Sequence, residues 1–231
     1  MPKKKVKKLP QRIIPLKNAD KTFHEQWKRK DSLFNFPAPF RMVLAGPPNV
    51  GKSTMIKHIL LHQDPPFEEV VVVHCDPENT AEYDDLGGED CNVTITDQIP
   101  HPSEWSDQNT KTLCIIDDLE LKHLSKQQKS NLDRAFGFCS THKNVNICLA
   151  VQDVFNIVPS VRRMSNIWVL WKNCDLDSLA NIARKCGMLT SELKAIFKNL
   201  MPNFRDSLMI DMTPKSPAPM RRNGFEIIEK N

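Results

Sequence analysis

A glycine-bounded loop constrains this 231-residue chain more than any other feature. Its residues match the pattern GxxxxGK[ST] in full: Gly46, Pro47, Pro48, Asn49, Val50, Gly51, Lys52, Ser53 and Thr54. An apolar run at residues 41–45 precedes the loop, and apolar residues recur at helical spacing over residues 55–60 after it. The sequence therefore predicts a strand, a phosphate-binding loop and a helix in succession.

The residue types of this loop suit a nucleoside triphosphate. Glycines at both ends let successive backbone N–H groups point inward at phosphate oxygens, and the positive end of the following helix adds to their effect. In such a loop we expect Lys52 to contact the β- and γ-phosphates and to act in catalysis, and the Ser53 hydroxyl to bind Mg²⁺. The expected cofactors are ATP and Mg²⁺, with residues 46–54 forming the nucleotide-binding loop.

A pair of acids ends a second apolar run, at residues 113–116. We expect Asp117 to be the second metal-binding residue, because a buried strand delivers its last side chain to the phosphate site. Asp118 follows directly and is the expected general base for an attacking water, which favours hydrolysis over transfer to a bound acceptor. Glu120 is the alternative base, and two solvated loop acids are the alternative to any catalytic role.

Polar residues further along the chain complete the set of candidates. Gln152 ends a strand predicted at residues 146–151, where an additional-strand P-loop ATPase places a polar side chain near the γ-phosphate; a helix-capping role is the alternative. Arg162 and Arg163 follow Pro159, and we expect them at the rim of the active site. There they are candidates for an arginine finger that acts on a neighbouring subunit, with ordinary surface charge as the alternative.

The apolar runs alternate with helical patterns along the chain, which predicts an α/β fold. Strands are expected at residues 70–75, 92–96, 113–116, 146–151 and 167–171, with a last one at 207–212. This order predicts a mostly parallel sheet with helices on both faces, of the additional-strand P-loop NTPase type, whose ligands lie at the carboxyl ends of the strands.

The chain divides into three parts by composition. We expect an extended basic leader at residues 1–38, the ATPase domain at residues 39–212, and a proline-rich, loosely held tail at residues 213–231. The first 30 residues carry eleven Lys or Arg against two acids, a net +9, so the remainder is at −5. Such a leader favours contact with nucleic acid, and a solvated tail is the alternative. Residues 3–8 also resemble a nuclear import signal.

Composition limits the compartment and class. Hydrophobic residues make up 40% and charged residues 26%, as in a soluble globular protein. No apolar stretch is long enough to span a membrane, and the lysine-rich N-terminus is unlike a secretory signal. The seven cysteines are scattered without a CxxC pair, which argues against a disulfide framework and favours a reducing compartment.

With these motifs assembled, the sequence resembles the FtsK/HerA superfamily of DNA-pumping ATPases, and within it the poxvirus-type genome-packaging ATPases of double-stranded DNA viruses, virophages and polinton-like viruses. The resemblance covers roughly residues 40–212 and rests on GPPNVGKST, LCIIDDLE, LAVQD and SVRRMSNIWVLWK. The chain has Asp-Asp where cellular relatives usually have Asp-Glu, which keeps both Asp118 and Glu120 open as the base. It also lacks the relatives' membrane and winged-helix modules.

The resemblance implies a pentameric or hexameric ring that hydrolyses ATP and translocates double-stranded DNA into a preformed capsid. Its implied partners are duplex DNA, further copies of the chain and a capsid or portal-vertex protein. The implied location is inside an infected host cell, in the nucleus or at the viral assembly site, or within the virion.

Three other functions share parts of these motifs. A superfamily-3 replicative helicase shares the GPP-type loop and the paired acids, but its Lys-to-Asp spacing is more compact than that from Lys52 to Asp117, and Asn is expected where Gln152 stands. A nucleotide kinase would need a basic lid and an acceptor pocket, which the acidic segment 76–107 does not resemble. A non-catalytic nucleotide-binding scaffold is the remaining alternative.

Overall fold

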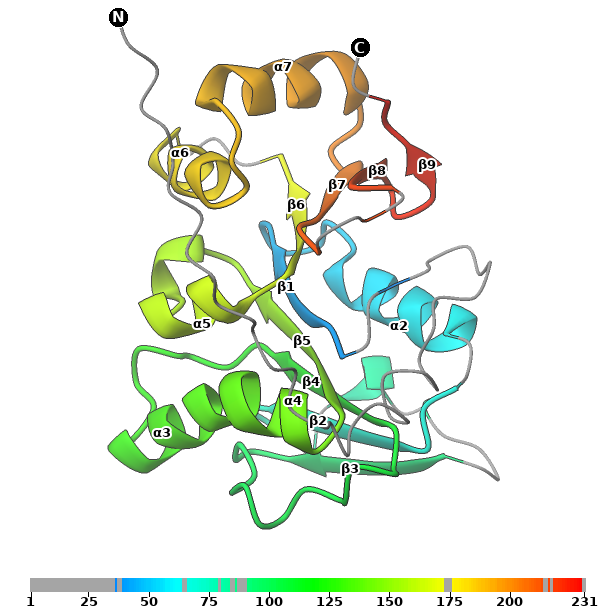
Figure 1. Ribbon diagram of the computed structural model, residues 1–231, viewed down its shortest axis with the longest axis vertical. Helices are drawn as coiled ribbons and strands as arrows, with labels where there is room; N and C mark the ends of the chain where they lie inside the picture. Colours follow the sequence, from blue (N-terminus) through cyan, green and yellow to red (C-terminus); the bar gives the residue numbers. More distant parts are fainter. Residues whose placement is uncertain are drawn as a thin grey trace, which may run out of the picture.

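The computed structural model describes residues 36, 39–63, 66–78, 80–83, 86, 91–172, 176–213, 216 and 218–229. Within these residues one nine-stranded sheet runs through the molecule (Figure 1) in the order β3-β2-β4-β5-β1-β6-β7-β8-β9. The strands are β1 Arg41–Ala45, β2 Glu69–His74, β3 Asn92–Thr96, β4 Thr112–Asp117, β5 Val145–Val151, β6 Ile167–Trp171, β7 Ser207–Asp211, β8 Met220–Arg222 and β9 Glu226–Ile227.

The sheet is parallel from β3 to β6 and antiparallel from β6 to β9. Strand β5 lies between β1, which leads into the phosphate loop, and β4, which ends in Asp117. This inserted strand defines the additional-strand arrangement, so the predicted fold is confirmed. The loops after β1, β4 and β5 consequently emerge at the same edge of the sheet.

Helices cover both faces of the sheet, as predicted. The helical elements are η1 Ala81–Tyr83, α2 Lys52–His62, α3 Lys126–Arg134, the π-helical turn η2 Ala135–Cys139, α4 Ser140–His142, η3 Val154–Asn156, α5 Pro159–Met164, α6 Leu176–Lys185 and α7 Thr190–Leu200. Ile56 and Ile59 of α2 belong to one buried cluster, and the second buried cluster contains residues of α3, α5, α6 and α7. One helix thus packs on the first face and several on the other.

Strand β1 shows how the sequence produces this layering. Successive strand side chains point to opposite faces, and Met42 and Leu44 pack in the cluster under α2 while Val43 and Ala45 pack in the cluster on the other face. All four are 5% exposed or less. A continuous apolar run, without alternation, is the pattern of a strand that is buried on both sides.

The C-terminal tail corrects our expectation of a loosely held connector. Strand β8 pairs with β7, and β9 pairs with β8, so the described tail residues extend the sheet beyond residue 212. Arg221 is buried, and its guanidinium lies 5.8 Å from the ring centroid of Phe36. The prolines that suggested a linker are confined to residues 214–219, and the paired residues that follow carry no proline.

The leader enters the described structure at one residue. Phe36 is buried, and its ring centroid lies 5.6 Å from that of Phe40, so this residue packs on the domain. Residues 1–35, including the basic cluster and the predicted import signal, lie outside the described residues. Among the described helices, none has the length and apolar character to span a membrane.

Candidate active site

The phosphate loop is held in a conformation that depends on its glycines. Gly51 has a φ of 105° and Asn49 a φ of 61°, both in the left-handed region that glycine and asparagine tolerate best. The Gly46 N–H donates to the Val151 carbonyl at 3.1 Å, which ties the loop to the end of β5. A Cβ at Gly46 would lie 2.8 Å from the Cβ of Trp171, so the close packing of β6 requires glycine at this position.

Lys52 is buried at the start of α2 and is fastened to its own loop. Its Nζ donates to the carbonyl oxygens of Gly46 at 3.0 Å and Pro47 at 2.9 Å. Burial lowers the pKa of the Lys52 ammonium, and the nearby carboxylates Asp117 and Asp118 oppose this shift. The ammonium therefore lies between the loop carbonyls and two acids, at a position from which it can bind a phosphate oxygen.

Asp117, Ser53 and Tyr83 meet at one carboxylate oxygen. The Ser53 hydroxyl donates to Asp117 Oδ2 at 3.2 Å, and the Tyr83 hydroxyl donates to the same oxygen at 2.6 Å. Asp117 Oδ1 accepts the N–H of Asp118 at 3.0 Å. The structure thus brings the two predicted metal-binding residues together, at the last residue of β4 and the first turn of α2.

This oxygen pair fits Mg²⁺. A hydroxyl and a carboxylate are hard oxygen ligands, and Mg²⁺ in nucleotide sites takes one or two protein carboxylates while substrate phosphates and waters fill the other positions. The described residues contain no group of three or more His, Cys, Asp or Glu side chains that would hold a metal by itself. Ser53 and Asp117 therefore suit a metal that arrives with a nucleotide.

The two candidate bases occupy different places. Asp118 is exposed, has a φ of 48°, and lines the cavity at the phosphate loop. Glu120 lies outside that cavity, with its side chain 80% exposed and 3.7 Å from His123. A non-glycine residue in the left-handed region is a strained conformation of the kind found at functional sites. The geometry favours Asp118 as the residue next to the phosphates.

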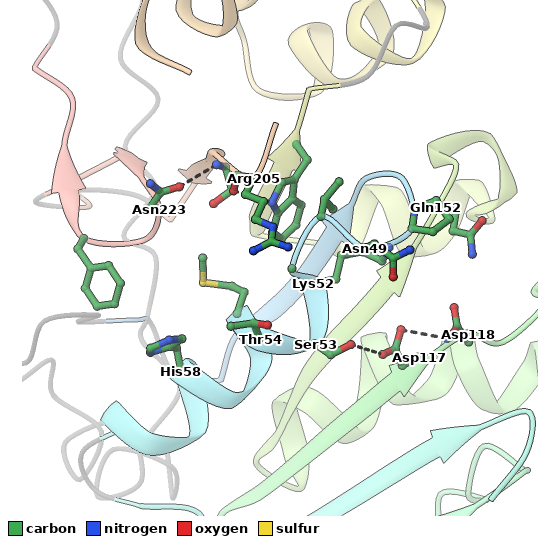
Figure 2. Close-up of a pocket in the computed structure, with 17 residues that line it drawn as sticks. Asn49, Lys52, Ser53, Thr54, His58, Asp117, Asp118, Gln152, Arg205 and Asn223 are labelled. Carbon is green, nitrogen blue, oxygen red and sulfur yellow. Dashed lines mark hydrogen bonds between the residues drawn. The ribbon is translucent and has the colours of Figure 1, made fainter. Parts of the chain in front are cut away.

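A single large cavity joins these groups (Figure 2). Its volume is about 760 Å³, and it is lined by loop residues 48–54, by Asp117, Asp118 and Gln152, and by residues of the C-terminal part of the chain. A volume of this size suits a nucleotide. Gly46 and Pro47 contact Lys52 through their carbonyl oxygens but do not line the cavity. Asp118 and Gln152 lie at its border, because both also line a neighbouring cavity of about 500 Å³, which Glu120 lines as well.

Arg162 and Arg163 lie elsewhere, which corrects the expected position at the active-site rim. They are in the last turn of α5, just before β6 begins, and the intervening Asn166 accepts the N–H of Arg41 at the start of β1. They are therefore at the amino ends of the strands, opposite the phosphate loop. With Lys185 they line a separate cavity of about 230 Å³. The expectation was wrong because α5 runs from the carboxyl end of β5 back to the amino end of β6.

Several residues of the site were not anticipated from the sequence. They include Tyr83, which contacts Asp117, His58 of α2, and three residues near the C-terminus that line the cavity, Arg205, Asn223 and Phe225. The side chain of Arg205 points into the cavity toward Lys52 (Figure 2). These residues belong to no recognised sequence motif. The position of Ser207 at the start of a returning strand was the one available signal, since an antiparallel β7 begins at the edge where β6 ends.

The fold, and not the sequence, relates this chain to known proteins. No protein-family model and no curated protein matches the sequence. Among solved structures, the genome-packaging NTPase B204 of Sulfolobus turreted icosahedral virus 2, in complex with ATP-γS, is similar with a TM-score of 0.56 and 18% identity, over 82% of this chain and 99% of that one.

Two further solved structures share the same fold over part of their length. The pCW3 conjugation coupling protein TcpA has a TM-score of 0.52 and 13% identity, over 84% of this chain and 62% of that chain. The type VII secretion ATPase EccC of Thermomonospora curvata has a TM-score of 0.53 and 10% identity, over 84% of this chain and 26% of that chain. At these identities the likeness establishes a shared P-loop NTPase fold.

Proposed function

We propose that this chain is an ATP-hydrolysing motor that translocates double-stranded viral DNA into a capsid. One observation carries the proposal: a single cavity joins Lys52, Ser53, Asp117 and Asp118, on a fold shared with a viral genome-packaging NTPase over nearly the whole length of that protein. The neighbour was solved with ATP-γS and with AMPPCP, which supports a nucleoside triphosphate as the ligand here.

The chemistry follows from the positions of the side chains. Backbone N–H groups of the loop and the Lys52 ammonium bind the triphosphate. Ser53 and Asp117 hold Mg²⁺, which when bound offsets the charge that develops on the phosphate oxygens. Asp118 accepts a proton from the attacking water, whose oxygen bonds to the γ-phosphorus while the bond to the β,γ-bridging oxygen breaks. Gln152 orients that water from the end of β5. The products are ADP and phosphate.

The active form is a ring of identical subunits. Within the described residues, Arg162 and Arg163 are far from their own phosphate loop and make no ion pair. A finger that acts on a neighbouring subunit needs such a place away from its own site. Arg205 differs from them because it lines the cavity of its own chain. It can therefore reach a bound triphosphate without a neighbouring subunit.

The basic leader is the proposed contact with DNA, and its net charge of +9 is the supporting observation. Removal of residues 1–30 should make the fall of log affinity with log salt on duplex DNA less steep, and it should leave basal hydrolysis intact. An unchanged slope would exclude the leader from DNA contact.

The proposed locations are the nucleus or assembly site of an infected cell, or the virion, and a reporter that carries residues 1–12 tests import. The proposed docking partner is a capsid or portal-vertex protein.

Displacement of a third strand from a DNA triplex tests the proposed motor. A translocase that moves along an intact duplex should remove the third strand in an ATP-dependent way, and the Lys52→Ala variant should not. Unwinding of a forked duplex without triplex displacement would contradict the proposal and support the helicase alternative. Transfer of phosphate from ATP to a nucleoside monophosphate would support the kinase alternative instead.

A further inference from the structure

The cavity at the phosphate loop has two chemically different ends. Figure 2 shows Asp117, Asp118 and Gln152 at one end, Lys52 and Thr54 between, and His58 and Asn223 at the other. The metal-binding pair and Lys52 fix the first end as the place of the β- and γ-phosphates. The rest of a bound nucleotide must therefore extend toward His58 and Asn223.

We propose that the C-terminal hairpin of β8 and β9 forms the nucleoside half of this site, with Phe225 as the residue on which the base stacks. The inference rests on the proposed function to the extent that a nucleoside triphosphate is the ligand. It assigns a binding role to a segment that, from its sequence, we expected to be a loosely held tail.

Phe225 is held in place as a stacking residue requires. It lines the cavity, is half-buried, and packs partly against the buried cluster under α2. Its ring centroid lies 6.2 Å from those of His58 and His62, with interplanar angles of 88° and 80°. These perpendicular contacts hold the ring in place beside the cavity. An aromatic face fixed beside a nucleotide cavity is a platform for a base.

The hairpin is anchored firmly enough to present this ring. The Asn223 N–H donates to the Ser207 carbonyl at 2.8 Å, and the Ser207 N–H donates to Asn223 Oδ1 at 2.9 Å. Arg222 Nη2 lies 3.2 Å from each carboxylate oxygen of Asp206. Burial alone raises the pKa of Asp206, but hydrogen bonds from Asn203, Asn223 and Arg222 hold it below its usual value. Asp206 is thus kept as a charged anchor.

These bonds also restrict what the hairpin can recognise. Asn223 Oδ1 accepts from Ser207, and its Nδ2 donates to Asp206 Oδ1 at 3.2 Å, so one acceptor and one donor of this amide are already used. Stacking accepts any base, because every base has a π-face, whereas discrimination needs hydrogen bonds to the base edge. We therefore expect ATP, GTP and CTP to bind with similar affinity.

Calorimetric titration of the full chain with ATP, GTP, CTP and inorganic tripolyphosphate, each with Mg²⁺, tests the inference. Phe225→Ala and Phe225→Leu should each weaken the three nucleotides about tenfold, the scale of losing one base–aromatic stack. Tripolyphosphate has no base, so its affinity should stay the same. Phe225→Trp should retain nucleotide affinity. Phe138→Ala removes a half-exposed phenylalanine that lines no cavity described here and is the matched control.

The leucine variant keeps apolar packing and guards against a folding defect in Phe225→Ala. Unchanged nucleotide affinity in Phe225→Leu would overturn the inference, and so would an equal loss for tripolyphosphate and nucleotides. A wild-type preference of more than about 100-fold for one base would overturn stacking as the mode of recognition. A protein that binds nucleotides through Phe225 but hydrolyses none would instead contradict the proposed function and leave the nucleoside seat standing.

Discussion

The hydroxyl of Tyr83 donates a 2.6 Å hydrogen bond to Asp117 Oδ2, the same oxygen that the Ser53 hydroxyl contacts. Tyr83 is 1% exposed and is the only tyrosine in the sequence. It comes from the short turn η1, within the acidic segment 76–107. The orientation of the carboxylate proposed to bind Mg²⁺ thus depends on a residue outside every recognised motif.

Tyr83→Phe should therefore weaken metal use. Groups that orient a metal ligand are worth about 10- to 100-fold in metal affinity or activity, so we expect the Mg²⁺ concentration for half-maximal hydrolysis to rise at least tenfold. Nucleotide binding measured in EDTA should be unchanged, because the phosphate loop is intact. Metal titration of the ATPase rate checks this, and a wild-type Mg²⁺ dependence would show that Tyr83 is not needed to orient Asp117.

Gly46→Ala should disrupt the phosphate loop. The new Cβ would lie 2.8 Å from the Cβ of Trp171 and 3.2 Å from its Cε3, and neither atom can move without shifting β6. Overpacking of this kind costs about 1–3 kcal/mol, and we expect lower thermal stability together with at least tenfold weaker nucleotide binding.

Gly137→Ala is the matched control for this loop variant. Its Cβ would meet the Sδ of Met164 at 3.3 Å, and a methionine side chain can give way. We expect nucleotide binding close to that of the wild type. Equal losses in both variants would mean that helix and loop conformation, and not the contact with Trp171, explains the requirement at Gly46.

Asp118→Asn should separate binding from hydrolysis. Among the described residues the side chain lines the cavity without a hydrogen bond or ion pair to Lys52 or the loop, so ATP and Mg²⁺ should still bind. Hydrolysis should fall at least ~100-fold, as expected on loss of a general base. Glu120→Gln, on an exposed side chain outside the cavity, should remain active. Normal hydrolysis in Asp118→Asn with a dead Glu120→Gln would reverse the assignment.

Local patterns were enough to predict the sheet and the phosphate site. The strands predicted at 41–45 and 92–96 became β1 and β3 with the same bounds. The apolar run of β1 is continuous because this strand is buried on both faces, whereas β3 is a partly exposed edge strand. Asp117 and Gln152 follow such strands directly, so their place at one edge of a parallel sheet was implied by topology. The side-chain contacts made across that edge could not be predicted in the same way.

The missed residues depend on long-range packing that no short pattern encodes. Phe225 reaches the cavity only because β8 and β9 continue the sheet past β7, and the prolines at 214–219 concealed that continuation. Arg162 and Arg163 were misplaced because the direction of α5 decides which sheet edge they occupy. Tyr83 had no periodic neighbours to indicate that a turn would bury it.

Mixing of inactive subunits tests the proposed ring. An inactive Lys52→Ala subunit combined with an inactive Arg162→Ala or Arg163→Ala subunit should regain activity, because each lesion spoils a different half of a shared site. Loss of the finger itself should cost ~10³-fold or more in turnover, with ATP affinity little changed. Arg205 faces the cavity of its own chain, so Arg205→Ala should fail to complement Lys52→Ala. Recovery in no mixture, with specific activity independent of dilution, would exclude a trans-acting arginine.

The ATPase rate with long duplex DNA, compared with single strands of the same length and with no DNA, tests the central claim most directly. A packaging motor that grips duplex through its charged leader and ring should hydrolyse ATP fastest with duplex, and the Lys52→Ala variant should show no rate above background. Stimulation by single strands but not by duplex, or a rate indifferent to DNA, would contradict the account.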